Sequence, residues 1–378
     1  MHFRNPYKTG IDYDTLAKGV APDIDLSPFI PGAPIALLKA LLYRDFQRCI
    51  TVPDDRLCPA VPPRLDYVLW FEDIITFTMN SRQPRNETCS IIDIGTGASI
   101  IYPLLDSKVL ASDVSFVGTE VDLSSTGYAI ENMLRNGLNS RIQVLKTETE
   151  GPLLPQKLWE LHDRYTVLMC NPPFYSTAEE MDAAESSKQR PRIQALLGAS
   201  VETLTPGGAA GFILRILDES LQHKDGVLWF SCLCGHQEVL ERVVAELRER
   251  KIENYAISKF EHGQTTRWAV AWSFHALRLP NDISRAGETP ELLHLLPQVL
   301  AVGKDDQNGE TDQRFGIETG NNSPSPAPLN RCGIAADLPR QDLLKRVFSR
   351  LLPKVPRYQA SIETLRHFRA SKRTLGTE

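Results

Sequence analysis

The sequence predicts an α/β fold: a doubly wound sheet of seven strands whose last two strands are antiparallel, with a helical extension at the N-terminus. Short apolar runs alternate with segments of helical spacing from residue 91 onwards, as is typical of parallel sheets with helices on both faces. The last two runs are separated only by residues 261–265, which is too short for a crossover helix, so they must be antiparallel. The 378 residues are 42% hydrophobic, enough for a sizeable core.

The N-terminal residues 1–61 precede this alternation and form the predicted helical extension. Apolar residues recur at helical spacing over residues 34–46, including Ile35, Leu38 and Leu42. Residues 62–79 predict a second, amphipathic helix with prolines in its first turn, where proline is tolerated. We place the start of the main domain at residue 62 and its end at residue 277.

The main domain contains the seven predicted strands and at least three helices. The strands are expected at 91–94, 115–121, 142–145, 165–170, 227–232, 255–260 and 266–274, and helices at 124–136, 212–221 and 237–250. Ser124 or Ser125 is the expected N-cap of the first helix, and Gly137 should end it.

The pattern dissolves after residue 277. Residues 278–338 are predicted to be a disordered linker, because they include a stretch rich in Asn, Ser and Pro at 321–328. Residues 339–378 form a basic tail with helical spacing. From residue 341 the tail carries nine basic residues: Lys345, Arg346, Arg350, Lys354, Arg357, Arg366, Arg369, Lys372 and Arg373.

Charge and composition exclude some classes of protein. The net charge of −5 disfavours a generally basic nucleic-acid binder, but local clusters, such as the tail and Arg4 with Lys8, decide contacts with phosphates. No apolar run approaches the roughly 20 residues of a membrane span, and the N-terminus lacks the apolar core of a signal peptide. Seven scattered cysteines suggest reduced thiols. We expect Cys232 and Cys234 to be buried strand residues, and no metal site.

The turn at Cys170–Phe174 is the most informative stretch of the chain. Asn171 offers an acceptor and donors, Pro172 and Pro173 stiffen the turn and leave carbonyls free to accept, and Phe174 offers a face for a flat ring. Such a turn can hold a planar group that bears an amine. Asn and Pro are also ordinary turn formers, so the alternative is a turn that merely ends a strand.

Two further features fall at the same edge of the predicted sheet. Asp93, Gly95, Thr96 and Gly97 follow the first strand, where glycines let a ligand approach the backbone. Glu120 ends the second strand, where an acid can accept from both hydroxyls of a ribose. The glycine motif is shorter than Gly-x-Gly-x-x-Gly and does not favour a pyrophosphate. A nucleoside without pyrophosphate recognition fits S-adenosyl-L-methionine better than NAD.

These features resemble the class I S-adenosylmethionine-dependent methyltransferases, whose sheet is Rossmann-like. More closely, the chain resembles the U6 small nuclear RNA adenine methyltransferase family, which includes methyltransferase-like protein sixteen and its fungal relatives. The resemblance covers roughly residues 1–275. It rests on Met1–Lys8, Val61–Tyr67, Ile92–Ser99, Ile101–Leu105, Thr119–Asp122, Cys170–Phe174, Trp229–Cys232 and Thr266–Phe274.

The resemblance implies a role for each matching residue. Arg64, Gly95, Glu120 and Asn171 match cofactor-contacting positions. Asn171, Pro172 and Phe174 match positions that hold the target adenine, and Pro173 completes the motif. Arg4, Lys8 and Arg267 match basic positions of the RNA groove. For Arg64 and Arg267, the alternative is an arginine in a surface ion pair.

The implied function is methyl transfer to the N6 amine of an adenosine in structured RNA, with U6 small nuclear RNA as the first expectation. Ribosomal RNA is an alternative substrate. A protein glutamine methyltransferase, which uses a similar motif, and a non-catalytic RNA-binding scaffold are further alternatives. A small nuclear RNA substrate implies the nucleus, and the reduced thiols leave the cytoplasm open.

Overall fold

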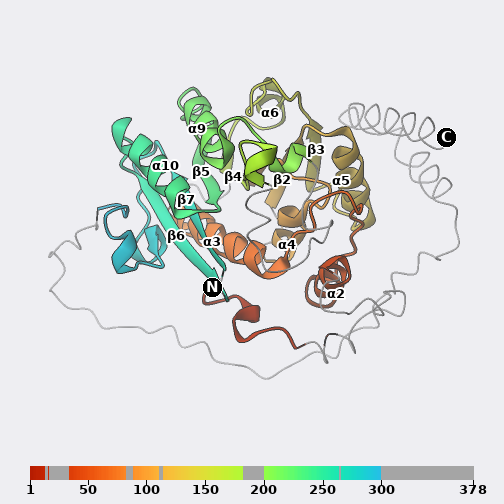
Figure 1. The fold of residues 1–378 in the computed structure, drawn as a ribbon. Helices are drawn as coiled ribbons and strands as arrows, with labels where there is room; N and C mark the ends of the chain where they lie inside the picture. Colours follow the sequence, from red (N-terminus) through yellow and green to blue (C-terminus); the bar gives the residue numbers. More distant parts are fainter. Residues whose placement is uncertain are drawn as a thin grey trace, which may run out of the picture. The chain divides into compact units, whose positions relative to one another are not determined.

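A mixed sheet of eight strands forms the centre of the fold (Figure 1). The computed structural model describes residues 1–12, 16, 34–81, 88–109, 114–181, 200–263 and 265–298, all within one compact unit. The strands are β1 Cys89–Ile94, β2 Val114–Glu120, β3 Ile142–Lys146, β4 Tyr165–Cys170, β5 Val227–Cys234, β6 Tyr255–His262, β7 Thr265–Trp272 and β8 Arg285–Ala286. The first seven confirm the predicted strands, and β8 is an addition that no sequence pattern indicated.

The spatial order of the strands is β3-β2-β1-β4-β5-β7-β6-β8. Strands β1 to β5 are parallel to their neighbours, whereas β7 pairs antiparallel with both β5 and β6. The predicted antiparallel arrangement of the last two long strands is therefore confirmed. The chain moves outwards from β1 to β3 and then returns to β4 on the other side of β1. This reversal creates a crevice at the carboxyl ends of β1 and β4, where α/β sheets bind ligands.

Helices cover both faces of the sheet (Figure 1). They are α2 Pro34–Phe46, α3 Val61–Asn80, α4 Ile101–Val109, α5 Leu123–Arg135, α6 Gln156–Leu161, α8 Ser200–Thr203, α9 Gly208–Ser220, α10 Gln237–Glu249 and α11 Asn281–Ser284, with 3-10 turns η1 Pro6–Thr9 and η3 Pro290–Leu292. Helices α4 and α6 were not predicted. Pro103 interrupts the apolar pattern of α4, although proline is tolerated so early in a helix.

Strand β5 shows how its two faces are filled. On one face, the Trp229 indole N–H donates to Thr78 Oγ1 of α3 at 3.1 Å, and Ser231 Oγ lies 2.7 Å from the Tyr67 hydroxyl of the same helix. Phe230 belongs instead to the buried cluster that includes residues of α9 and α10. Because successive strand residues point to opposite faces, α3 covers one side and α9 and α10 cover the other.

The N-cap of helix α5 lies two or three residues before the predicted one. The N-cap is Asp122, whose carboxylate accepts a hydrogen bond from the Ser125 backbone N–H at 2.7 Å. The prediction of Ser124 or Ser125 was therefore wrong, because strand β2 ends at Glu120 and leaves Asp122 extended directly before the helix. Gly137 follows the helix with a φ of +65°, as expected of a glycine that ends one.

Residues 49–57 of the extension are fixed along α5. The Asn132 amide donates to the carbonyls of Thr51 and Ala98, each at 2.9 Å, and its oxygen accepts from the Thr51 N–H. Asn136 makes the equivalent pair of hydrogen bonds with Cys49. Each side-chain amide therefore hydrogen-bonds both the N–H and the carbonyl of one residue, as a neighbouring strand would.

The first ten residues are docked on α3 around one buried carboxylate. Asp66 has no exposed surface, and its Oδ1 accepts from the His2 backbone N–H at 2.9 Å and from the Asn5 amide at 2.6 Å. His262 Nε2 of β6 lies 2.7 Å from the other oxygen. Asp66 thus joins the N-terminal residues, α3 and β6.

The assignment of residues 278–298 to the predicted disordered linker was wrong. Residues 278–298 form α11, β8 and η3, and Leu292, Leu295 and Leu296 are buried against the central cluster. These leucines are too few to show a repeating pattern, but they pack against a surface made by distant residues. Residues 299–338 and the basic tail 339–378 lie outside the described residues.

Within the described ranges, no helix is long and apolar enough to cross a membrane, and no group of His, Cys, Asp or Glu is arranged to hold a metal. Cys232 and Cys234 are buried free thiols of β5, as predicted.

Candidate active site and cofactor pocket

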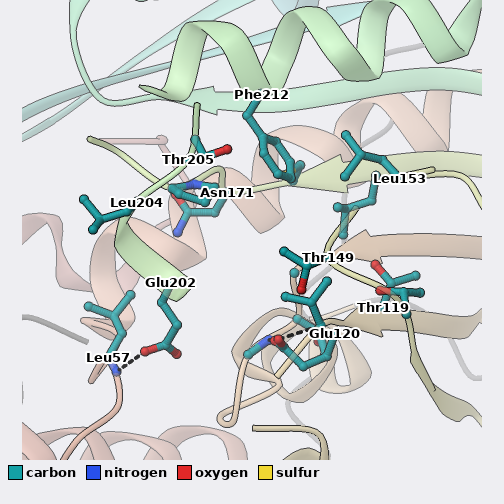
Figure 2. Close-up of a pocket in the computed structure, with 18 of the residues that line it drawn as sticks. Leu57, Thr119, Glu120, Thr149, Leu153, Asn171, Glu202, Leu204, Thr205 and Phe212 are labelled. Atoms are coloured by element: carbon teal, nitrogen blue, oxygen red, sulfur yellow. Dashed lines mark hydrogen bonds between the residues drawn. The ribbon is translucent and has the colours of Figure 1, made fainter. Parts of the chain in front are cut away.

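A pocket opens at the carboxyl ends of β1, β2 and β4 (Figure 2). Eight of the residues singled out from the sequence line it: Arg64, Gly95, Thr96, Gly97, Glu120, Asn171, Pro173 and Phe174. The turns after β1 and β4, the last residue of β2 and the first turn of α3 supply them. The fold therefore brings together residues that are far apart in the sequence.

The glycine turn after β1 exposes backbone to the pocket. Gly95 and Gly97 adopt φ angles of +69° and +67°, in the left-handed region that favours glycine. Asp93 is not in the pocket lining; it lies below the turn and accepts a hydrogen bond from Thr96 Oγ1 at 2.7 Å. Burial raises the pKa of Asp93 to about 7, against the opposing effect of the Thr96 hydrogen bond. Asp93 shapes the turn, whereas Gly95, Thr96 and Gly97 form the surface that a ligand meets.

Glu120 presents its carboxylate to the pocket from the end of β2. Its Oε2 accepts from the Gly97 N–H at 3.0 Å, and its Oε1 accepts from the N–H groups of Val121 and Asp122 at 2.8 Å each. A carboxylate has about four acceptor sites, so Oε2 retains capacity for a hydroxyl donor. Burial raises the pKa of Glu120 to about 7; the backbone hydrogen bonds lower it, and the nearby Glu202 carboxylate raises it. Hydroxyl groups of a ligand that donate to Glu120 would favour the ionised form of its carboxyl group.

The Asn171–Phe174 turn forms the adjoining wall. The Asn171 amide borders the pocket (Figure 2), and no hydrogen bond to it occurs within the described residues. Pro173 and Phe174 also line the pocket, while Pro172 does not. The Phe174 ring packs on Gly235, where a β-carbon would lie only 3.0 Å from Phe174 Cδ1. A partly buried amide that makes no hydrogen bond to the described part of the chain, beside an aromatic ring, is suited to bind a flat polar group.

Two arginines approach this wall from different elements. Arg64 lines the pocket from the first turn of α3, with no ion pair among the described residues. Arg267 of β7 donates to the Thr266 carbonyl at 2.8 Å and lies at 3.5 Å from the Gly235 carbonyl. Burial lowers the pKa of Arg267, and the charge of Arg64 lowers it further. Neither arginine is in a surface ion pair of the described chain, so this region favours anions.

Arg4 and Lys8 differ in their surroundings. Arg4 forms ion pairs with Glu72 and Asp73 of α3, each at 2.5 Å, and donates to the Leu69 carbonyl at 3.0 Å. A phosphate would have to replace these partners, so the structure gives Arg4 a role in docking the N-terminal residues. Lys8 is exposed in the last turn of η1 and makes no such pair within the described chain. Contact of either residue with RNA remains a prediction.

Several pocket residues had no signal in the sequence. Glu202 enters the pocket from α8, Thr205 follows that helix, and Phe212 comes from α9. Glu202 Oε2 accepts a hydrogen bond from the Leu57 N–H at 3.0 Å (Figure 2). These residues reach the site through pairing between distant segments, which a linear motif does not reveal.

Comparison with known proteins places this geometry in context. The profile of a family described as RNA methyltransferase matches residues 1–276. The U6 small nuclear RNA (adenine-(43)-N(6))-methyltransferase of Schizosaccharomyces pombe is 39% identical over 251 residues, which are 66% of this chain and 63% of that protein. A ribosomal RNA large subunit methyltransferase F of Flavobacterium johnsoniae is 30% identical, over 72% of this chain and 93% of the other.

Solved structures agree with the fold. The hMettl16 catalytic domain in complex with MAT2A 3'UTR hairpin 6 matches with a TM-score of 0.63 and 35% identity, over 74% of this chain and 99% of that domain. The N-terminal domain of human METTL16 in complex with SAH matches with a TM-score of 0.57 and 34% identity, over 73% of this chain and 99% of that domain.

Proposed function

This chain belongs to the RNA methyltransferase family whose profile spans residues 1–276, and we propose that it transfers a methyl group from S-adenosyl-L-methionine to the N6 amine of an adenosine in structured RNA. We propose U6 small nuclear RNA as the substrate. The observation that carries the proposal is the Asn171 amide, which lines the same pocket as Phe174 and Glu120 and makes no hydrogen bond to the described residues. The similarity to the S. pombe enzyme supports the choice of RNA.

The pocket fits the methyl donor on chemical grounds. Glu120 can accept from ribose hydroxyls, and the turn at Gly95–Gly97 offers backbone to the methionine part. Arg64, which forms no ion pair with the described residues, suits the donor's carboxylate. The complex of METTL16 with SAH supports this assignment. The donor supplies an activated methyl on a sulfonium, so no strong base is needed to make the amine react.

The turn then acts on the amine. One adenine N–H donates to Asn171 Oδ1 and the other to the carbonyl of Pro172, a residue of the turn that is not itself in the pocket lining. Both acceptors favour the pyramidal nitrogen that forms as its lone pair bonds to the methyl carbon and the S–C bond of the donor breaks. The methylated amine then loses one proton to water. Because positive charge develops on that nitrogen, these acceptors help most in the transition state. Stacking of the base on Phe174 contributes about 1–3 kcal/mol. Unstacking the base from RNA costs a few kcal/mol, which favours a target in a loop or bulge.

Basic residues hold the RNA beside the pocket. Arg267 and Arg64 provide the positive region next to the turn, and Lys8 is free to reach a phosphate. Phosphate contacts of this kind position an RNA without selecting its sequence. If U6 is the substrate, the enzyme acts in the nucleus, which imaging of the tagged full chain would test.

The experiment compares Asn171→Ala with the wild-type chain, using labelled donor and a U6 hairpin. We expect a loss of methyl transfer of at least about a hundredfold with little change in donor affinity. Asn80→Ala, an exposed position at the end of α3, is the matched control. Transfer by Asn171→Ala at the wild-type rate would refute the proposed role.

Ribosomal RNA is the second candidate substrate, because the F. johnsoniae methyltransferase F is similar over most of its length. The same assay on a fragment of large-subunit RNA distinguishes the two. Faster methylation of the ribosomal fragment than of U6 would select this alternative.

A further inference from the structure

We infer that Glu202 is a positioning residue that couples the donor pocket to the Asn171–Phe174 turn. Its carboxylate binds the segment before α3, at Leu57, which borders the proposed donor site. The residues directly after Glu202, 203–205, pair with the end of the turn. The inference rests on the proposed function, since it assigns the two sides of the pocket to donor and adenine. It adds a connection between the donor side and the adenine side, which depends on the length of the Glu202 side chain and on its hydrogen bond to Leu57.

The first contact of Glu202 is with the segment that precedes α3. Glu202 Oε2 accepts from the Leu57 N–H at 3.0 Å, and Leu57 itself lines the pocket. Oε1 lies 3.8 Å from the position that a β-carbon of Gly97 would occupy. The carboxylate is therefore above the glycine turn, at the edge of the proposed donor site.

The second connection runs from Glu202 to the turn. Directly after Glu202, the Thr203 carbonyl accepts from the Tyr175 N–H at 2.9 Å, and the Thr205 N–H donates to the Tyr175 carbonyl at 3.0 Å. These bonds form a short parallel bridge between Tyr175 and Leu204. Tyr175 follows Phe174, so a displacement of Glu202 is transmitted to the aromatic wall through one paired residue.

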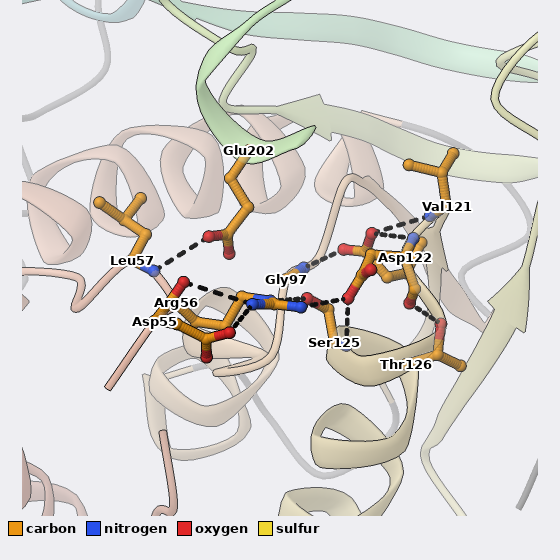
Figure 3. A network of polar contacts seen from close by, with 10 residues as sticks. Asp55, Arg56, Leu57, Gly97, Val121, Asp122, Ser125, Thr126 and Glu202 are labelled. Carbon is orange, nitrogen blue, oxygen red and sulfur yellow. Dashed lines mark hydrogen bonds and ion pairs between the residues drawn. The ribbon is translucent and has the colours of Figure 1, made fainter. Parts of the chain in front are cut away.

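The segment that Glu202 contacts is held by a network of polar contacts (Figure 3). Arg56, which precedes Leu57, is buried; its guanidinium donates to Ser125 Oγ at 3.0 Å and to Asp122 Oδ1 at 2.9 Å. Asp122 caps α5, and its own N–H donates to Glu120. Hydrogen bonds and the peptide bond between Arg56 and Leu57 therefore join Glu202 to the carboxylate proposed to bind the ribose.

This arrangement explains how an occupied donor site can order the adenine site. A donor that bonds Glu120 and the glycine turn stabilises the frame around Leu57. The Leu57 N–H that Glu202 binds is then held in place. Residues 203–205 in turn hold the Asn171–Phe174 turn in the conformation that binds adenine. At position 202, a charged but shorter side chain would lose the hydrogen bond to the Leu57 N–H. A side chain of equal length that keeps an acceptor oxygen would preserve this bond.

The test uses three substitutions. Glu202→Gln keeps the length and an acceptor oxygen, Glu202→Asp keeps the charge but is one methylene shorter, and Glu202→Ala removes both. We expect Glu202→Gln to stay within about twofold of wild type, and Asp and Ala to raise the donor KM about five- to tenfold, the range for one lost hydrogen bond. Glu249→Asp, at an exposed position of α10, is the control.

A second readout follows the coupling without RNA. In wild type, S-adenosyl-L-methionine should slow hydrogen exchange at the Tyr175 and Thr205 amides, and this protection should be lost in Glu202→Asp and kept in Glu202→Gln. The reverse order of Gln and Asp, or equal behaviour of all variants, would overturn the inference. Should the variants fail to fold, absence of donor-dependent protection in wild type would overturn it as well.

The two proposals fail in different ways. Donor-dependent protection without methylation of any RNA would overturn the proposed function and leave the coupling intact. Methylation of RNA with Glu202→Asp unchanged in donor KM and exchange would do the opposite.

Discussion

The Phe174 ring lies so close to Gly235 that a β-carbon at position 235 would be 3.0 Å from Phe174 Cδ1 and 3.1 Å from Cε1. Gly235 follows β5, directly after Cys234. The absence of a side chain at this position sets where the aromatic wall of the proposed adenine site stands. The contact links the end of β5 to the turn after β4.

Gly235→Ala should therefore displace the Phe174 ring. Gly235 is not among the residues with positive φ, so alanine adds a steric clash without backbone strain. We expect the RNA KM to rise about tenfold or more while the donor dissociation constant, measured by calorimetry, stays within twofold. In a double-mutant cycle with Phe174→Ala, the two losses should be less than additive. Fully additive losses would mean that Gly235 acts elsewhere.

Arg4 and Lys8 should give different results when each is replaced by alanine. Loss of Arg4 breaks the ion pairs with Glu72 and Asp73, so the melting temperature should fall and the N-terminal residues should become sensitive to protease. Loss of Lys8 should leave melting unchanged and reduce the salt dependence of RNA binding by about one unit of slope. An unchanged melting temperature for Arg4→Ala would contradict its docking role.

Donor binding should tighten as the pH rises through about 7. Burial raises the pKa of Glu120 from 4.5 to about 7, and ribose hydroxyls require the ionised carboxylate as acceptor. The ionised fraction rises from roughly a tenth at pH 6 to nine tenths at pH 8, so the affinity should increase about tenfold. Calorimetry at the two pH values tests this, with Glu120→Gln as a weak-binding, pH-independent control. A flat profile for wild type would rule out ionised Glu120 as the acceptor.

The same shift has the opposite effect on the stability of the protein without donor. A folded-state pKa above the unfolded value means that Glu120 stabilises the fold fully below about pH 4.5, and this contribution disappears as the pH rises through about 7. Asp93 has a shift of the same sign. The free energy of unfolding should fall less between pH 5 and pH 8 in Glu120→Gln than in wild type; an equal fall would assign the pH dependence to other groups.

Asn132 should be important for stability although it lies outside the pocket. Its buried amide makes three hydrogen bonds to Thr51 and Ala98. Asn132→Ala leaves these backbone groups unsatisfied and should cost about 2–4 kcal/mol. Urea unfolding measures the change, with Asn80→Ala as the control. A loss below about 0.5 kcal/mol would show that the 49–57 segment is held by other contacts.

Features with a local signal could be predicted from the sequence. The seven main strands are apolar runs with turns at their ends, and the residues at those ends, such as Gly95, Glu120 and Asn171, meet because parallel strands share an edge. Features made by pairing between distant segments could not be predicted. Strand β8 has only two residues, too few for a sequence pattern. Arg4 forms ion pairs with Glu72 and Asp73 of α3, and Glu202 binds Leu57, which is 145 residues away in the sequence.

The position of the transferred methyl group tests the central claim most directly. A U6 hairpin would be incubated with the full chain and labelled donor, digested to nucleosides and analysed by mass spectrometry. We expect label only in N6-methyladenosine, and none when the target adenosine is replaced by purine riboside, which lacks the amine. Label on another atom or nucleoside, or undiminished label on the RNA without the amine, would contradict the assignment of Asn171 and Phe174 to an adenine amine.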